Sequence, residues 1–157
     1  MNQIQASLVG VVLASGLVLT AQAAAPEDVV ARILQAQDEQ SLAATWRDWH
    51  PKAEHKVIIK YGLGQKDDVF SYRLADDVPA EDPQFARALE GYQELSRSAP
   101  TISSVHNDGV TRVTAATRVH YEWQGYSGEM LQTDDFAFTA YLGVSVIRSL
   151  VTTYDYR

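Results

Sequence analysis

The C-terminal third of the chain is the part of the sequence that most narrows the fold. Residues 110–123, 129–141 and 144–156 are three long runs rich in β-branched and aromatic residues, in which apolar and polar side chains alternate. Glycines separate the runs, and this combination is typical of β-strands joined by tight turns. The sequence therefore predicts an antiparallel sheet of these three strands, preceded by a strand that ends at the Asp108-Gly109 turn.

The turns also predict a register, which decides which side chains share a face of the sheet. We expect a two-residue turn at 108–109, a four-residue loop at 125–128 and a three-residue loop at 141–143. These turns place the apolar residues of four strands on one face. The expected cross-strand pairs are Ile102 with Ala115, Trp123 with Met130, Tyr121 with Gln132, Val119 with Asp134, Phe136 with Arg148, and Asp134 with Leu150.

The N-terminal segment is typical of an export signal. Residues 6–25 carry no charge, and the apolar run ends in Ala21-Gln22-Ala23, a small-x-small cleavage pattern. The sequence predicts a signal peptide over 1–23 and a single domain over 24–157, located in the periplasm or secreted, without stable membrane insertion after cleavage. The alternative is a retained membrane anchor, since about 20 apolar residues can span a bilayer.

Charge and cysteine content exclude several classes of protein. The chain has 13 basic and 20 acidic residues, a net charge of -7, and no cysteine. Disulfides and thiolate metal sites are therefore excluded. The acidic balance argues against binding to nucleic acid or to an anionic membrane.

The middle of the chain alternates between helical and extended patterns. Helices are expected from Pro26 and over 41–49, the second being stopped by His50-Pro51. Strands follow over 54–61 and 69–74, and a third helix is expected from the Asp82-Pro83 cap to about Ser96.

This order of elements resembles the NTF2-like superfamily, in particular its SnoaL-like branch. The resemblance rests on residues 41–53, on 135–143, and on Val146-Ile147 and Tyr154-Asp155 near the end. It implies an α+β, cystatin-like cone, in which a curved, mostly antiparallel sheet wraps around three helices. It also implies a pocket at the wide end of the cone.

A pocket of this kind would bind a small apolar or amphipathic molecule between aromatic walls and a few polar groups. Such a binding protein need not be catalytic. The alternative is a filled cone that serves protein interactions, in which Asp134 and Arg148 form a buried ion pair. The expected pocket residues are Trp49, Tyr121, Trp123, Gln132, Asp134, Arg148, Thr152 and Tyr154.

A further alternative is a SnoaL-like lyase, isomerase or hydrolase, whose resemblance implies a pocket carboxylate as acid or base. Strand alternation points Asp134 inward, whereas counting back from Gly143 selects Asp135, so both are candidates. The four histidines have no spacing that predicts a metal site, and the sequence indicates no cofactor.

The other face of the sheet is a candidate interface. The expected register lines Ala116, Ala137 and Ile147 across it, with Arg118 opposite Asp135. A contiguous apolar row on an exposed sheet face suggests a partner, and the resemblance implies dimerisation there. We expect a homodimer formed through this outer face.

Overall fold

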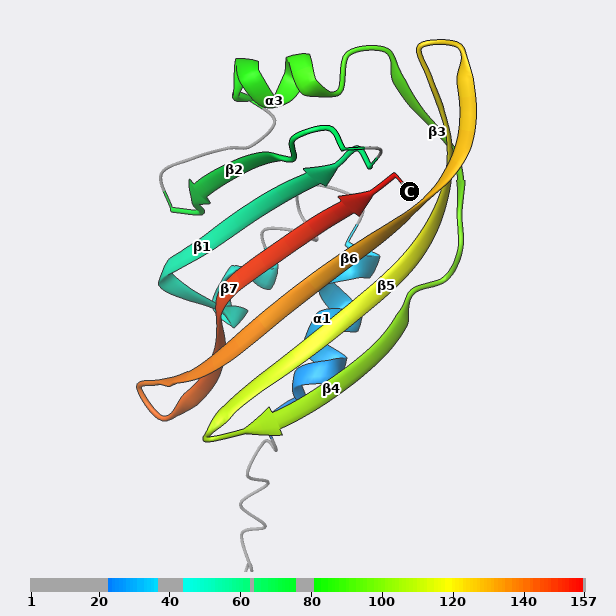
Figure 1. Cartoon of the computed structure of the whole chain (residues 1–157). Helices are drawn as coiled ribbons and strands as arrows, with labels where there is room; N and C mark the ends of the chain where they lie inside the picture. The colour runs from blue at the N-terminus through cyan, green and yellow to red at the C-terminus, as the bar shows by residue number, and fades with distance from the viewer. Residues whose placement is uncertain (1–22, 37–43, 63, 76–80, 157) are drawn as a thin grey trace, which may run out of the picture.

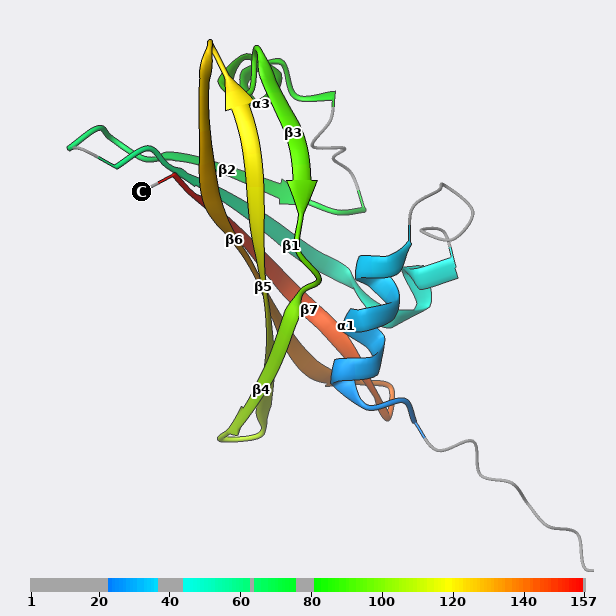
Figure 2. The same cartoon turned by 90° about the vertical axis from the view of Figure 1, so that its right-hand side faces the viewer.

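The computed structural model describes residues 23–36, 44–62, 64–75 and 81–156. One curved sheet of seven strands forms the body of the molecule (Figure 1). Helix α1 (Pro26–Gln35) lies against one face of this sheet, and the short helix α3 (Pro83–Ala88) lies at its upper end (Figure 2). The segment 1–22, most of the predicted signal peptide, is outside the described residues.

The sheet is mostly antiparallel, as the sequence predicts. Its spatial order is β2-β1-β7-β6-β5-β3, and β4 also pairs with β5. Only the contact between β1 and β7 is parallel among the strand pairs of the described chain. The strands are β1 (Trp49–Lys60), β2 (Asp68–Arg73), β3 (Tyr92–Arg97), β4 (Thr101–Asn107), β5 (Val110–Trp123), β6 (Tyr126–Tyr141) and β7 (Val144–Asp155).

One of the three predicted turns is confirmed. The Asp108-Gly109 turn pairs Ile102 with Ala115. The other two predictions were wrong, because both hairpins close over two residues, Gln124-Gly125 and Leu142-Gly143, with φ of 51°, 84°, 48° and 81°. Positive φ at both positions is the type I′ geometry that matches the twist of paired strands. The shorter turn at Gln124-Gly125 moves the partner of every β5 residue on β6 by four positions. Because four is even, each side chain stays on the predicted face of the sheet, but its cross-strand neighbour differs from the predicted one.

A bulge in β7 overturns two further predicted pairs. Phe138 pairs with Ile147, but Ala137 pairs with Ser149, which leaves Arg148 as the extra residue. Beyond the bulge, Leu150 lies opposite Phe136 rather than Asp134.

The expected inward position of Arg148 is therefore wrong, and the alternative of a buried ion pair with Asp134 does not hold. Asp134 lies opposite Thr152. Arg148 is exposed, and its guanidinium donates to the backbone carbonyl of Lys52 in β1.

Two predicted helices also differ from the structure. The helix expected to reach Ser96 ends at Ala88, because Gly91 takes a φ of 78° and Tyr92 begins β3. In the region expected to be helical up to Trp49, the described part consists of a helical segment at 44–45 and the 3-10 helix η1 (Trp46–Asp48). Trp49 starts β1, and His50-Pro51 lies inside that strand rather than before it.

The main core lies between α1 and the concave face of the sheet. The apolar face of α1 buries Val29 and Val30 against Val113, Phe136 and Ile147. Ile147 was predicted on the outer face; instead it is 0% exposed, because the bulge reverses the alternation of β7 at this point. Burial of such side chains, each worth about 1.5–3 kcal/mol, holds α1 on the sheet.

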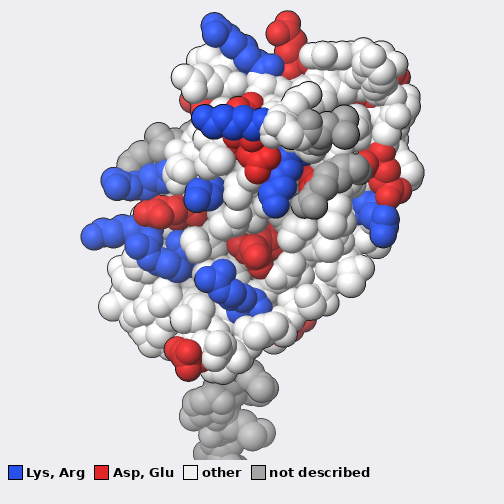
Figure 3. Space-filling model, viewed as in Figure 1, with Lys and Arg blue, Asp and Glu red and all other residues white. Residues whose placement is uncertain are grey.

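The outer face carries no helix within the described residues. Basic and acidic side chains are scattered over it, with uncharged surface between them (Figure 3). Arg118 was expected opposite Asp135, but it pairs with Leu131 and forms an ion pair with Glu129 at 2.7 Å. No helix in the described part of the chain combines the length and hydropathy needed to cross a membrane.

Candidate functional site

A chain of hydrogen bonds crosses three strands on the concave face. The hydroxyl of Thr152 (β7) donates to Asp134 Oδ1 (β6) at 2.7 Å, and Gln132 Nε2 donates to Asp134 Oδ2 at 2.8 Å. On the other side, His55 Nε2 (β1) lies 3.0 Å from the same Thr152 hydroxyl. Strand pairing produces this chain. Thr152 pairs with Asp134 on one side and with Val57 on the other, and His55 is two residues before Val57, on the same face of β1.

The direction of these bonds fixes the tautomer of His55. A threonine hydroxyl carries one proton, and Thr152 donates it to Asp134. The hydroxyl therefore accepts from His55, so the hydrogen of the imidazole is on Nε2. Nδ1 is left as a hydrogen-bond acceptor, and among the described residues it has no partner.

Burial shifts the acidities of both ends of the chain. Desolvation lowers the pKa of His55 to about 4, so the imidazole is neutral at physiological pH. Desolvation also raises the pKa of Asp134, against the opposing effects of the Thr152 and Gln132 hydrogen bonds and the charge of Arg97. The site thus favours uncharged groups, with one acceptor on the histidine.

An apolar cavity of about 330 Å³ borders His55. Its walls are formed by side chains of α1, of the segment before β1, of β1 itself, of the residue after β2 and of β7. They are Ile33, Thr45, Trp46, Trp49, His55, Leu74 and Leu150. Volumes of this order suit small ligands, and the imidazole is the one titratable group among these walls.

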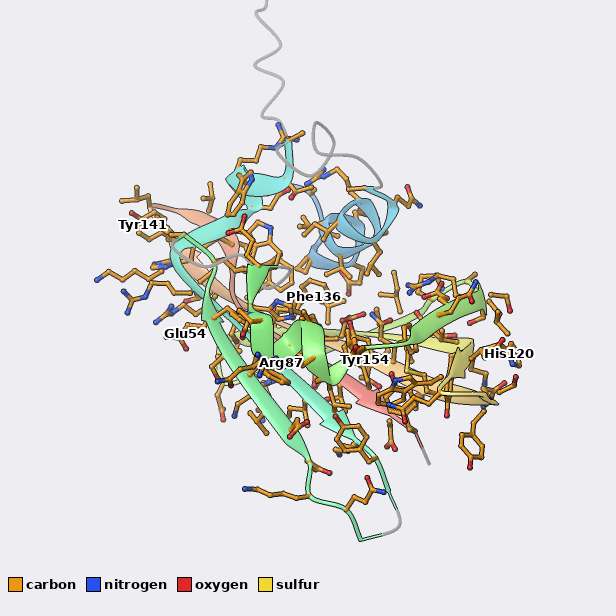
Figure 4. All side chains as sticks on the ribbon, turned by 90° about the horizontal axis from the view of Figure 1, so that it is seen from above. Glu54, Arg87, His120, Phe136, Tyr141 and Tyr154 are labelled. Carbon is orange, nitrogen blue, oxygen red and sulfur yellow. The ribbon has the colours of Figure 1, made fainter. Side chains whose placement is uncertain are left out.

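The structure distributes the predicted pocket residues over several places. Trp49 lines the cavity, while Gln132, Asp134 and Thr152 form the hydrogen-bonded chain behind it. Tyr154 lies toward the centre of the molecule, as does Phe136, whereas His120 and Tyr141 lie at opposite ends (Figure 4).

Tyr154 shares the desolvated region. Burial, and secondly the negative charge of Asp134, raise its pKa to about 12. The remaining predicted residues lie elsewhere: Tyr121 and Trp123 line a separate cleft, and Arg148 is exposed at the bulge.

The structure distinguishes the two candidate carboxylates. Asp134 is 5% exposed on the concave face. Asp135 is on the outer face, where it lies opposite Thr114 and accepts its hydroxyl hydrogen bond at 2.5 Å.

Sequence reasoning missed several cavity residues. The signal for His55 was present, since it alternates with Lys56 and shares the parity of the buried Val57 and Ile59. Thr45 falls in the helix expected over 41–49, and Leu74 ends the strand expected over 69–74. Neither was selected, because local periodicity does not show which residues of separate elements meet at one cavity. No cluster of three metal-ligating side chains occurs in the described ranges.

Comparison with known proteins gives structural similarity only. No protein-family model matches the sequence, and no curated protein matches it. The chain is similar to solved structures. These neighbours include NTF2-like and ketosteroid isomerase-like proteins.

Three of these structures give the extent of the similarity. The β subunit of benzoate 1,2-dioxygenase from Burkholderia mallei is 8% identical, with a TM-score of 0.48, over 82% of this chain and 87% of the other. A ketosteroid isomerase-like protein from Erwinia carotovora is 15% identical, with a TM-score of 0.44, over 82% and 92%. An NTF2-like protein from Prochlorococcus is 9% identical, with a TM-score of 0.45, over 84% and 94%. Similarity at this level does not establish a function.

Proposed function

We propose that this protein binds a small, mainly apolar molecule that carries one hydrogen-bond donor, such as a hydroxyl, in the cavity beside His55. The observation that supports this proposal is the combination of an apolar wall with a single neutral imidazole. Thr152 and Asp134 hold that imidazole with Nδ1 as acceptor. A ligand that donates to Nδ1 satisfies it, whereas a charged ligand would lose its hydration without a counter-ion.

The test compares 2-naphthol with its methyl ether, 2-methoxynaphthalene, by calorimetric titration. We expect 2-naphthol to bind about fivefold more tightly, since a net hydrogen bond contributes roughly 1 kcal/mol. His55→Leu should remove the preference and keep binding of the ether. Leu74→Trp should obstruct both ligands.

His106→Leu is the matched control, because His106 is exposed in β4 and should leave both affinities unchanged. Equal affinity of the wild-type protein for the two ligands would contradict the role of His55. Failure of Leu74→Trp to reduce binding would place the ligand outside this cavity.

The same hydrogen-bonded chain favours a second candidate, an acid–base enzyme of the SnoaL-like kind. Here Nδ1 of His55 would accept a proton from a carbon acid, and Asp134 would stabilise the imidazolium through Thr152. Exchange of the α-hydrogens of 2-tetralone in D₂O, followed by NMR, tests this function. Exchange above the buffer rate that is lost in His55→Leu supports it, and exchange at the buffer rate contradicts it.

We also propose that the mature protein begins at Ala24 or within two residues of it and acts in the periplasm or outside the cell. The charge-free segment and the Ala21-Gln22-Ala23 pattern support this location. Intact-mass analysis of protein from the soluble extracytoplasmic fraction tests it. Recovery of the full 157-residue chain from membranes would contradict cleavage.

A further inference from the structure

A second cleft, of about 760 Å³, lies at the end of the sheet formed by the β5–β6 hairpin. The residue after β1, the penultimate residue Tyr156 and that hairpin form its aromatic walls, and α3 contributes a basic side chain. The residues that matter here are Tyr61, Arg87, Tyr121, Trp123, Tyr126 and Tyr156. None of them lines the cavity beside His55, so the two sites are separate.

The aromatic walls are fixed by contacts among themselves. The rings of Trp123 and Tyr156 are 5.3 Å apart, those of Tyr61 and Trp123 are 5.9 Å apart, and the Tyr121 ring stands edge-on to Tyr156 at 4.9 Å. Trp123 Nε1 also donates to the carbonyl of Glu90 at 2.8 Å, which holds the indole in place. Rigid aromatic surfaces of this kind suit a flat, apolar ligand.

Two tyrosines beside the cleft carry a buried polar group. They are Tyr156 of the aromatic walls and Tyr92, whose ring contacts Tyr121, Trp123 and Tyr156. The hydroxyls of Tyr92 and Tyr156 are buried, and neither has a hydrogen-bond partner in the described structure. A buried hydroxyl without a partner is destabilising, so phenylalanine would make a more stable core at these positions. The cluster is therefore not explained by packing alone.

Arg87 gives the cleft a single charge. It is the one ionic side chain among the lining residues, and within the described ranges it forms no ion pair. The protein as a whole is acidic, with a net charge of -7. The guanidinium of Arg87 is thus a positive group on an otherwise acidic protein. Its N–H donors have the planar arrangement that matches the two oxygens of a carboxylate.

We propose that this cleft binds a planar aromatic carboxylate, with the ring against the Trp123 and Tyr61 side chains and the carboxylate at Arg87. The site does not depend on the cavity beside His55. A neutral planar molecule lacks the partner for the guanidinium, and a non-planar acid lacks the contact with the rings.

Calorimetric titration with 2-naphthoate tests the proposal, with 2-naphthamide and cyclohexanecarboxylate as neutral and non-planar comparisons. We expect 2-naphthoate to bind saturably. The dissociation constants of both comparison molecules should be at least about tenfold higher. Arg87→Gln should weaken 2-naphthoate by at least about tenfold and leave 2-naphthamide unchanged. Trp123→Leu should weaken both naphthalene derivatives.

The matched controls are Arg112→Gln, an exposed arginine on the outer face, and Trp46→Leu, a tryptophan of the other cavity. Neither should change the affinity for 2-naphthoate. Equal binding of naphthoate and naphthamide, or an Arg87→Gln variant with wild-type affinity, would overturn the proposal. Loss of binding in Trp46→Leu instead would place the acid beside His55. Arg87 is exposed, so Arg87→Gln remains informative even where Trp123→Leu does not fold.

Discussion

The Thr152 hydroxyl donates a 2.7 Å hydrogen bond to Asp134 Oδ1 across the β6–β7 ladder. Both residues are about 95% buried, since Thr152 is 4% and Asp134 5% exposed. Because the same hydroxyl contacts His55, its removal separates the imidazole from the carboxylate.

Thr152→Val should therefore reduce the free energy of unfolding by about 1–3 kcal/mol, since it leaves the buried Asp134 with one donor instead of two. The measurement is urea titration at pH 7. Thr153→Val is the matched control, because Thr153 is on the outer face and next in sequence, and a change within about 0.5 kcal/mol is expected. Equal losses in the two variants would mean that the hydrogen bond to Asp134 contributes nothing.

His55 should make stability depend on pH in a defined direction. Its pKa falls from 6.5 to about 4 on folding, so the unfolded chain binds more protons between these values. The stabilisation is fully present above pH 6.5 and is lost as the pH falls toward about 4. His55→Leu should flatten the unfolding free energy over this interval. A wild-type slope in His55→Leu would contradict the burial of a neutral imidazole.

Asp134 should have the opposite effect. Its pKa is raised on folding, so its contribution is fully present below the unfolded value of 3.8 and is lost as the pH rises through the folded value. Asp134→Asn removes this cost at pH 7, and we expect the stability to change by less than about 1 kcal/mol or to increase.

The same substitution should reduce the preference of the cavity for a hydrogen-bond donor, since it alters the group that orients Thr152. Asp135→Asn is the control and should leave ligand binding unchanged, because Asp135 contacts Thr114 on the outer face. A ligand effect confined to Asp135→Asn would contradict the assignment of the site to the concave face.

The proposed homodimer cannot be tested at Ile147, because that residue is buried in the core and not on the outer face. The outer face has an uncharged cross-strand row over six strands, which consists of Thr101, Ala116, Thr133, Thr153, Ile58 and Val69. Thr133→Lys at its centre should convert dimers to monomers in light scattering at micromolar concentration. Val105→Lys, at an exposed position of β4, should leave the dimer intact. A monomeric wild-type protein would refute the interface.

The strands could be predicted because apolar and polar residues alternate along them. The positions where this alternation or a helical spacing is interrupted could not be predicted. Residues 110–123 form β5 as predicted, because their period of two is uninterrupted. The helix expected up to Ser96 failed, since Phe85, Leu89 and Tyr92 have helical spacing but Gly91 ends the helix between them. Pairing of Tyr92 with Trp123 then outweighs local propensity.

The candidate site was predictable to the same extent. Asp134 and Thr152 were selected correctly because the four-residue shift in the β5–β6 ladder keeps the parity. In the β6–β7 ladder, the one-residue error at the turn and the one-residue bulge cancel in their effect on parity. Arg148 was selected wrongly, because a bulge leaves almost no mark on the sequence. The adjacent Val146 and Ile147, both buried, are its one sign.

The bulge at Arg148 lies beside a second irregularity. In the β1–β7 ladder, Trp49 pairs with Ile147, but the next pair is Glu54 with Ser149, so β1 has three more residues than β7 between these two pairs. The irregularities of both strands thus lie at one corner of the sheet, where the Arg148 guanidinium donates to the Lys52 carbonyl. Three walls of the cavity, Trp49, His55 and Leu150, flank this corner. The volume of the cavity therefore depends on how many residues separate the paired positions of β1 and β7. Insertion or deletion of a single codon at 50–53 or at 148 would change that volume while every residue that lines the cavity stays the same.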